Sequence, residues 1–416
     1  MCSSDLLSAN EGTAGLEKIT IDARAGDPAR GAQARNTHRL LAPRDATADL
    51  VDLFGDVPGA AQPLAAALLA PSAPVAEVEP NDRATSAQTV TLPAVVAGRF
   101  HPRGDRDWIT FEAKAGEVWV FDLVSNRLGH ATDPCLTLES VTAGPDGAPV
   151  AKELAFVDDG PAEFVAGAID RPSADPTLEF TAPADGTYRL LVRDLKADSR
   201  TAPENAWVLV ARRPNPDFRV VALLAEQSRA DANRASVVPP VIDIGGSATF
   251  DVMVFRADGF AGDVVVEAEG LPAGVSASPA IAPARTNRAT LVLSAAEGMK
   301  PFSGTFRIVG KAKVGDAEVV RPARVATLRW SADNQNQPRI LREVHDLPLA
   351  VTGDAQPVSV TPVETKIWET ARGGKVSIPM SVVHRPGAKG EVKLAAPGLP
   401  AELKIPEITD RKSTRL

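Results

Sequence analysis

Histidine is scarce in this chain, and its scarcity excludes several kinds of catalytic site. Only five histidines occur in 416 residues. No His-Glu-x-x-His pattern is present, and no two histidines have helical spacing, which excludes a helical zinc-protease site. A Gly-x-Ser-x-Gly elbow and a phosphate-binding glycine loop are also absent. We therefore expect neither catalytic residues nor an organic cofactor in this chain.

A strongly positive charge and a long apolar run are missing as well. The formal net charge is −8 at pH 7, which argues against a broad nucleic-acid-binding surface. No apolar run reaches the ~20 residues that a membrane-spanning helix needs. The run from Leu64 to Ala76 comes closest, but Pro71 and Pro74 interrupt it. We expect a monomer with no nucleic-acid partner and no membrane span.

The two ends of the chain have an unusual coding property. Codons can be chosen for residues 1–6, with GTG as the start, and for 410–416 so that the two DNA strings are reverse complements over their shared stretch. Both strings resemble a common sequencing adapter. We interpret both segments as assembly scars rather than ordinary polar tails, and we expect an internal piece of a longer protein.

Cysteine is nearly absent. With Cys2 set aside as part of the N-terminal scar, only Cys135 remains, which excludes an intrachain disulfide. Cys135 lies in an alternating, strand-like run, and this setting predicts a small buried hydrophobe rather than a reactive thiol. Without a disulfide, the stability of the core has to come from apolar burial alone, which is sufficient in domains above ~100 residues.

What the chain does contain is short alternating apolar segments between turn residues. Proline makes up 35 of 416 residues, about 8% against an average near 5%, which favours turns and short strands over long helices. Trp119, Phe121 and Leu123 alternate along one predicted strand, so they fall on one face. Tyr188, the only tyrosine, follows an Asp-Gly turn. We predict an all-β protein of tandem β-sandwich domains.

The region before the first predicted sandwich is less regular. Segments within 7–58 alternate as strands do, although the run 48–54 is compatible with either a short helix or a strand. We interpret 7–58 as the tail of a truncated β-domain. Residues 59–75 are rich in alanine and proline, which is typical of a linker.

The C-terminal half contains one pattern twice, with offsets of 128, 129 and 128 residues between its landmarks. This period is too long for a solenoid, and each copy shows short β-runs typical of an immunoglobulin-like sandwich. We predict one such domain at 217–345 and an incomplete one at 346–409. The paired landmarks are Gly245-Gly246 with Gly373-Gly374, Arg256 with Arg385, and Gly270-Leu271-Pro272 with Gly398-Leu399-Pro400.

Oxygen-bearing side chains gather in two predicted turns. The first turn contains Glu77, Glu79, Asn81 and Asp82, and the second contains Asp105 and Asp107. Calcium takes six to eight oxygen ligands from such side chains and from carbonyls. The alternative is a pair of ordinary turns in which Asx side chains hydrogen-bond their own backbone. The residues alone leave both interpretations open.

The order of these motifs resembles a known family. Over about 76–212, the run closely resembles the bacterial pre-peptidase C-terminal domain, a small secreted β-sandwich without catalytic activity. The two later copies resemble bacterial immunoglobulin-like modules of planctomycete-like surface proteins. The run consists of Glu79-Pro80-Asn81-Asp82, Gly104-Asp105-Arg106-Asp107-Trp108, Asp133-Pro134, Asp158-Asp159 and Asp185-Gly186-Thr187-Tyr188.

This resemblance implies a jelly-roll-like sandwich followed by immunoglobulin-like sandwiches, and an extracellular or cell-surface location. It also implies calcium as a cofactor. The ligands carried over from the family are Glu79, Asn81, Asp82 and Asp105, with Asp107 as a weaker candidate.

Two hypotheses about function follow. The first is a non-catalytic segment that spaces, stabilises or targets a larger secreted protein, with an extracellular protein or a polysaccharide as its ligand. The alternative is a substrate-binding accessory tail of a secreted peptidase whose catalytic domain lies outside these residues. Exposed tryptophans would mark a ligand-binding face, but all five lie in or beside predicted strands, where a large ring is usually part of the core. They are Trp108, Trp119, Trp207, Trp330 and Trp368.

Overall fold

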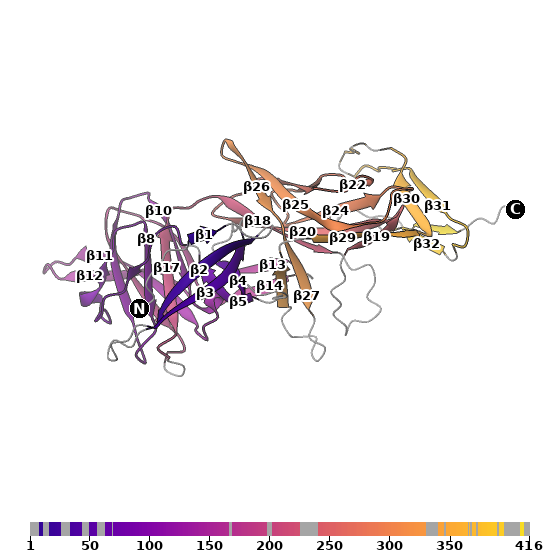
Figure 1. Cartoon of the computed structure of the whole chain (residues 1–416). Coiled ribbons are helices and arrows are strands. Elements are labelled where there is room, and N and C mark those ends of the chain that lie inside the picture. Colours follow the sequence, from indigo (N-terminus) through magenta and orange to yellow (C-terminus); the bar gives the residue numbers. More distant parts are fainter. Residues whose placement is uncertain are drawn as a thin grey trace. The chain divides into compact units, whose positions relative to one another are not determined.

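The computed structural model describes the chain in two compact units, Met1–Pro216 and Asp217–Leu416. Its described part consists of strands and two 3-10 turns, which confirms the all-β class (Figure 1). No described residue belongs to a helix with the length and apolarity needed to cross a membrane. The described residues are 8–10, 16–25, 34–43, 50–55, 63–68, 70–165, 169–197, 202–224, 240–329, 340–344, 347–364, 366, 368–371, 373–388, 391–394 and 408–411.

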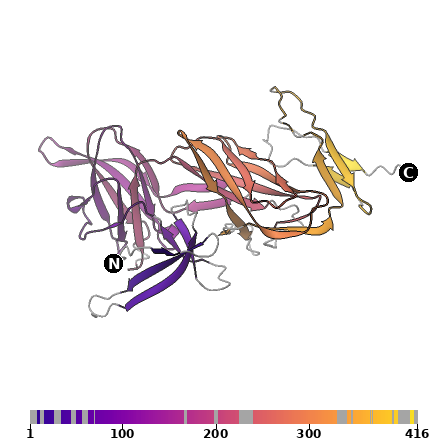
Figure 2. The ribbon, with the colours of Figure 1, turned by 45° about the horizontal axis from the view of Figure 1, so that its top comes forward.

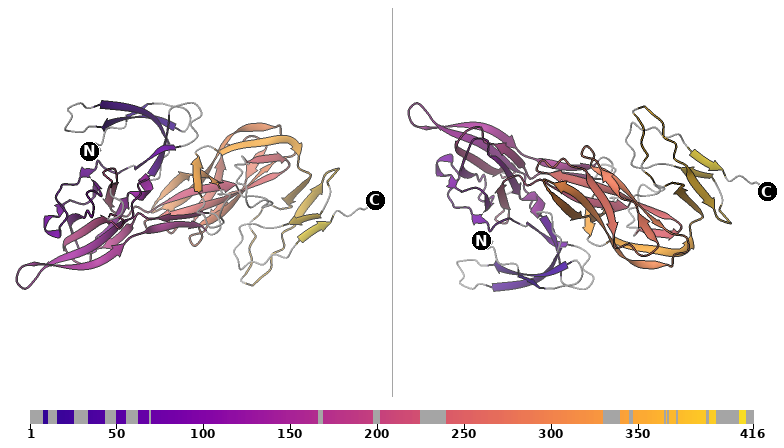
Figure 3. Two further views of the ribbon diagram at one scale, coloured as in Figure 1. Left: turned by 90° about the horizontal axis from the view of Figure 1, so that it is seen from below. Right: turned by 90° about the horizontal axis from the view of Figure 1, so that it is seen from above.

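The N-terminal strands form a sheet of their own, in the order β1-β2-β3-β4-β5, with its first strands in indigo in Figures 2 and 3. The fifth strand lies inside 59–75, so the linker prediction is wrong for 63–68. An alanine-rich run can still pair, although alanine is not favoured in strands, because the ladder uses only backbone N–H and C=O groups. The strands are β1 (Ser8–Asn10), β2 (Leu16–Ala25), β3 (Ala34–Pro43), β4 (Leu50–Gly55) and β5 (Pro63–Leu68).

The first sandwich consists of two five-stranded sheets with the orders β15-β10-β17-β8-β6 and β12-β11-β16-β9-β7. The short β6 and β7 pair in parallel with their neighbours, and the other neighbours are antiparallel. Eight antiparallel strands that form two sheets in this order make a jelly roll. The bounds are β6 (Val75–Ala76), β7 (Gln88–Thr89), β8 (Ala94–Arg99), β9 (Asp107–Ala113), β10 (Val118–Val124), β11 (Pro134–Ala143), β12 (Pro149–Val157), β15 (Thr177–Thr181), β16 (Gly186–Asp194) and β17 (Ala206–Arg212).

Three smaller elements complete the first unit. The strands β13 and β14 form a separate two-stranded ribbon. Two single turns of 3-10 helix, η1 and η2, lie in connections between strands. Their bounds are η1 (Ala84–Ser86), η2 (Asn126–Leu128), β13 (Gly160–Val165) and β14 (Ile169–Ser173).

The core of the first sandwich follows the predicted alternation. Trp119, Phe121 and Leu123 are all buried between the sheets. Cys135 is buried as well, but outside this core cluster, where its Sγ accepts the Nε–H of Arg193 at 3.3 Å. The hydroxyl of Tyr188 donates to the carbonyl oxygen of Ala184 at 2.7 Å, which satisfies the one polar atom of an otherwise buried ring.

The tryptophans divide into two groups. Trp119 and Trp207 are buried in the core, as predicted, whereas Trp108 and Trp368 are half-buried. Each half-buried ring has a cationic neighbour: the Arg189 guanidinium lies 5.5 Å from the Trp108 centroid and the Lys366 amine 4.2 Å from that of Trp368. Trp330 lies outside the described residues.

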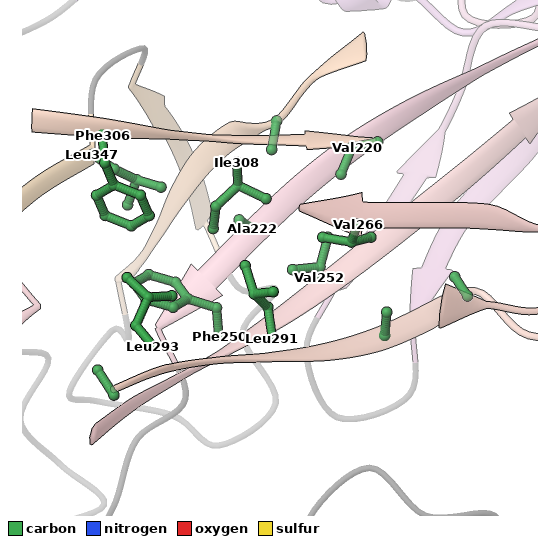
Figure 4. Packing of buried hydrophobic residues seen from close by; sticks show 14 of the residues in the cluster. Val220, Ala222, Phe250, Val252, Val266, Leu291, Leu293, Phe306, Ile308 and Leu347 are labelled. Atoms are coloured by element: carbon green, nitrogen blue, oxygen red, sulfur yellow. The ribbon is translucent and has the colours of Figure 1, made fainter. Parts of the chain in front are cut away.

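The second sandwich also has two sheets, with the orders β22-β24-β20-β18-β27-β28 and β19-β29-β25-β21-β23, and β26 pairs with β25. Figure 4 shows Phe250 and Leu291 packed with Phe306 and Ile308 in its core. The bounds are β18 (Asp217–Leu224), β19 (Val241–Ile244), β20 (Ser247–Ala257), β21 (Val264–Glu269), β22 (Val275–Ala277), β23 (Ala280–Ala282), β24 (Arg288–Ala295), β25 (Phe302–Val314), β26 (Ala317–Pro322), β27 (Arg324–Arg329), β28 (Ile340–Val344) and β29 (Leu347–Ala355).

The second sandwich extends further than predicted. We placed its end at residue 345, but β29 pairs with β25, and its alternate residues Leu347, Leu349 and Val351 are buried in the common core. The boundary prediction is therefore wrong by one strand. Sequence landmarks located the repeat but carried no information about which sheet receives the strand between the two copies.

The remaining described strands of the C-terminal part form two antiparallel pairs, β30 with β31 and β32 with β33. The last strand includes residues 410 and 411, which we had assigned to the C-terminal scar; residues 1–6 and 412–416 lie outside the described part. The bounds are β30 (Val358–Pro362), β31 (Met380–His384), β32 (Glu391–Leu394) and β33 (Ile408–Arg411).

Candidate metal centre

The candidate site lies where the chain enters the first sandwich. Residues 75–82, here called the arm, begin with β6, which runs parallel to β8. The backbone N–H of Glu77 donates to the Ala97 carbonyl at 2.9 Å, and the Glu77 carboxylate accepts the N–H of Arg99 at 2.8 Å. Main-chain pairing therefore fixes the Glu77 side chain beside β8.

The end of the arm is attached to β9. The Asn81 carbonyl accepts the backbone N–H of Trp108 at 3.1 Å. Asp107, the first residue of β9, is fully buried, and its Oδ2 accepts the indole N–H of Trp207 at 3.0 Å. The indole comes from β17 in the opposite sheet, so this contact crosses the interior of the sandwich.

Four side chains meet at this point, and we call Glu77, Glu79, Asn81 and Asp107 the acid cluster. Oxygens of the three carboxylates lie within 4.8 Å of one another. Asn81 is completely buried between two of them. With its amide nitrogen turned toward the carboxylates, it donates to Glu79 Oε2 at 3.0 Å and to Asp107 Oδ1 at 3.3 Å. With its oxygen turned there, four oxygen-bearing side chains converge.

One oxygen of the acid cluster lacks a partner. Glu77 Oε2 is buried, and no described hydrogen-bond donor reaches it. The space around it is closed by Gly98, where a Cβ would stand 2.1 Å from Glu77 Oε2 and 2.3 Å from Cζ2 of Trp207. Only glycine fits at position 98 while the carboxylate and the indole occupy these positions. A buried carboxylate oxygen of this kind requires a proton or a cation.

The electrostatics agree with that requirement. Burial raises the pKa values of Glu77 and Asp107, and the two carboxyls influence each other. Burial also raises the pKa of the nearby Asp105 to about 6, and the charges of Glu79 and Asp82 add to the rise. The causes of these shifts include burial, hydrogen bonds and neighbouring carboxylates but no basic side chain.

The structure separates the five predicted ligands into three groups. Glu79, Asn81 and Asp107 meet in the acid cluster. Asp105 is buried beside it, but its carboxylate accepts the backbone N–H groups of His101 at 2.7 Å and Arg106 at 3.0 Å. Asp82 is exposed. Asp107, which the resemblance ranked lowest, is thus more central than Asp82.

Sequence reasoning missed three participants. Glu77 was noted as a donor but was not included among the ligands, although it lies two residues before Glu79, on the same side of an extended segment. Trp207 and Gly98 come from distant strands, and no local pattern connected them to the acidic turns.

The residues present fit a hard divalent cation. All donors of the acid cluster are oxygens, and calcium binds carboxylate and amide oxygens, whereas zinc and copper favour nitrogen and sulfur. Glu77, Glu79, Asn81 and Asp107 would hold the ion. It would neutralise three carboxylates, of which Asp107 is buried, Glu77 half-buried and Glu79 exposed.

Comparison with known proteins adds no family name. No model of a known protein family matches the chain, and no curated protein matches it either. The fold and the site define an all-β protein of tandem sandwiches with a partly buried cluster of acids at the start of its jelly roll. Membership of the pre-peptidase C-terminal and immunoglobulin-like families stays a prediction based on the motifs.

Proposed function

We propose that the first sandwich is a non-catalytic, calcium-binding module of an extracellular or cell-surface protein. Its role is to hold neighbouring parts of that protein at a fixed spacing. The observation that carries this proposal is the acid cluster, in which three carboxylates and one amide converge around a buried oxygen without a partner.

A cation at this position would connect the arm to β9. Glu77, Glu79 and Asn81 belong to the arm, whereas Asp107 belongs to β9. An ion held by both segments would fix the path by which the chain enters the sandwich, in addition to the hydrogen bond from Trp108 to Asn81. Restricting this path limits the freedom of whatever precedes the arm, which suits a spacer in a string of domains.

The extracellular assignment is consistent with the affinity expected of the site. Extracellular calcium modules bind with dissociation constants of about 10⁻⁴–10⁻³ M. The acid cluster is small and part of it is exposed, because Glu79 faces solvent. We expect an affinity in this range, which would leave the site filled outside a cell and empty in the cytoplasm.

Two described nucleophiles, Cys135 and Ser125, have surroundings that support a non-catalytic role. Burial raises the pKa of the Cys135 thiol, which keeps it in the unreactive protonated form. Among the buried serines, Ser125 is engaged with the Thr132 hydroxyl at 2.8 Å and with the Ala206 carbonyl at 2.7 Å. These partners are structural groups and not bases that would activate a hydroxyl.

Thermal unfolding of the full chain in calcium and in a chelator tests the proposal. Saturation at about 100 times the dissociation constant adds ~2.7 kcal/mol to the stability of the folded state, so the transition of the first unit should move to a higher temperature. Magnesium at equal concentration should have a smaller effect because it demands a tighter octahedral shell.

Asp107→Asn supplies the matched variant. An asparagine keeps the shape and the acceptor for the Trp207 indole but removes a ligand charge, so the calcium-dependent rise should be lost. Asp159→Asn is the control, because Asp159 is exposed in a turn after β12; it should retain the full rise. A wild-type chain that melts at one temperature with and without calcium would refute calcium binding.

A further inference from the structure

A short segment, 213–216, here called the connector, joins β17 of the first unit to β18 of the second. Pro214 and Pro216 make up half of it. A proline ring fixes its own φ and excludes the helical region for the residue before it, so Arg213 and Asn215 are restricted to extended conformations as well. The connector is therefore stiffer than a glycine- or serine-rich linker of equal length.

The first residue of the connector is attached to the first sandwich by three contacts. Arg213 Nη2 forms an ion pair with Glu117 Oε1 at 2.5 Å. Its Nη1 donates to the Val118 carbonyl at 3.3 Å, and its guanidinium carbon lies 3.8 Å from the centroid of the Trp119 ring. A planar guanidinium is suited to stack on an aromatic ring while its N–H groups bind oxygens.

The groups that hold Arg213 are themselves fixed. Glu117 Oε2 accepts the backbone N–H of Lys114 at 3.0 Å, which leaves Oε1 for the arginine. The Trp119 ring belongs to the core of the first sandwich and is only 3% exposed. A partly exposed ion pair contributes little by itself. Arg213 also covers a ring of the core, so its position is coupled to the packing of the sandwich.

The residue that follows the connector is attached to the second sandwich. Both carboxylate oxygens of Asp217 bind Arg321 of β26, at 3.0 Å to Nε and 2.8 Å to Nη2. Asp217 Oδ1 also accepts the backbone N–H of Phe218 at 2.7 Å, and the Phe218 ring is buried in the second core. Only 214–216 lie between the two attachments, and two of these residues are prolines.

We propose that 213–217 act as a strut that restricts motion between the two sandwiches, with Arg213 as its positioning residue. The use of the strut rests on the proposed spacing function, but its contacts include no residue of the acid cluster. A cation in the acid cluster would fix the entry of the chain into the first sandwich, whereas Arg213 fixes its exit. The first sandwich would then be held at both ends.

Pulsed electron paramagnetic resonance on the full chain tests the strut. Spin labels at Glu153→Cys and Ser294→Cys, which are exposed positions on β12 and β24, report the distribution of distances between the two units. Cys2→Ser leaves the buried Cys135 as the one unlabelled cysteine. We expect a narrow distribution. A Gly-Gly-Ser-Gly-Gly-Ser insertion after Asn215 is the flexible reference, and it should broaden the distribution at least about twofold.

Substitutions at the first attachment measure its contribution. Arg213→Ala removes all three contacts and should broaden the distribution at least halfway toward the reference. Glu117→Gln removes the charge of the ion pair but keeps the ring stacked, so it should broaden the distribution less. Arg285→Ala is the matched control, because Arg285 is an exposed arginine of the second sandwich; it should have no effect. These widths should be equal in calcium and in chelator, so a failure of calcium binding would leave them unchanged.

Two results would overturn the proposal. One is a wild-type distribution as broad as that of the insertion variant. The other is a narrow distribution that Arg213→Ala does not change, because the prolines alone would then account for the stiffness. The melting temperature of the first unit shows whether Arg213→Ala is folded. If it is not, Arg213→Lys takes its place; it keeps the charge without the planar fork and should give an intermediate width.

Discussion

Both sandwiches bury a core between two sheets, but the polarity of their interiors differs. Ten of the eleven buried polar or charged residues in the described part precede Pro216, and the eleventh, Ser359, lies beyond the second sandwich. The fully buried part of the second sandwich is thus apolar, and its polar contacts, such as the ion pair of Arg321 with Asp217, are only partly buried. The first sandwich differs because it places charged side chains in its interior.

The first sandwich contains two clusters of polar side chains, and they differ in whether a cation accompanies the carboxylates. Arg127 joins Asp122 at 2.6 Å and Asp175 at 3.0 Å, and Asp175 also accepts two backbone N–H groups. This network contains one cation for its two carboxylates. The acid cluster contains three carboxylates, and no cation is among the causes that raise the pKa values of Glu77 and Asp107. Carboxylates with a cationic partner stabilise a fold, whereas carboxylates without one are suited to bind a cation.

The largest expected effect is the loss of stability when an aromatic ring is removed from the apolar core of the second sandwich. Phe250→Ala should lower the free energy of unfolding of the second unit by about 3–5 kcal/mol, because it opens a cavity in a closed core. Ile378→Ala, at a residue that is 50% exposed, should change it by less than about 0.5 kcal/mol, as surface substitutions do. Denaturant unfolding of both variants measures the difference. Equal losses would show that Ile378 is buried in a closed core.

The next largest effect concerns the ion pairs that Arg127 forms with Asp122 and Asp175. Arg127→Met preserves much of the side-chain volume but leaves Asp175 buried without its cationic partner, and such a loss costs about 3 kcal/mol. Arg288→Met is the control, because its ion pair with Asp251 is partly exposed and should contribute less than about 1 kcal/mol. Denaturant midpoints of the two variants provide the test; similar values would mean that the buried network adds nothing.

The pH dependence of stability tests the acid cluster and the neighbouring Asp105. Asp105 has a pKa of about 6 in the folded state against 3.8 for the unfolded chain, so its contribution to stability is complete below pH 4 and lost as the pH rises through 6. Glu77 and Asp107 shift in the same direction. In chelator, the melting temperature of the first unit should therefore fall between pH 5 and pH 8.

Calcium should reverse this trend, because it competes with protons for the same oxygens. The calcium-dependent rise in melting temperature should be larger at pH 8 than at pH 5, and Asp107→Asn should flatten both profiles. A rise that is independent of pH would place the ion away from the acid cluster.

The smallest effect concerns one hydrogen bond. Tyr188→Phe removes the hydroxyl that bonds to Ala184 and keeps the ring contact with Phe111, whose centroid is 5.8 Å away. The expected cost is about 1 kcal/mol. Thermal unfolding measures it, and an unchanged transition would assign the role of Tyr188 to packing alone.

Alternation and repeats in the sequence were enough to predict the strands but not their partners. The burial of Trp119, Phe121 and Leu123 follows from a period of two. The membership of β29 in the second sandwich does not follow from this period, since an alternating strand can pair with many sheet edges. The presence of β5 was hidden by its alanine-rich composition.

The site was predictable only in its local part. Glu79 and Asn81 are close in sequence, so a turn brings them together. The contact between Asp107 and Trp207 spans 100 positions, and it exists because β9 and β17 lie in opposite sheets that pack face to face. Spacing along the chain carries no information about such a contact until the strand order is known.

The indole of Trp207 gives the acid cluster a natural optical reporter. Its ring is buried, and its N–H donates to an oxygen of Asp107. Any change of charge on that carboxylate, whether by proton or by metal, alters the electric field across the ring and shifts its emission. Trp207 is one of five tryptophans, so a fluorescence titration of the unlabelled protein, compared with that of Asp107→Asn, would follow the filling of the site.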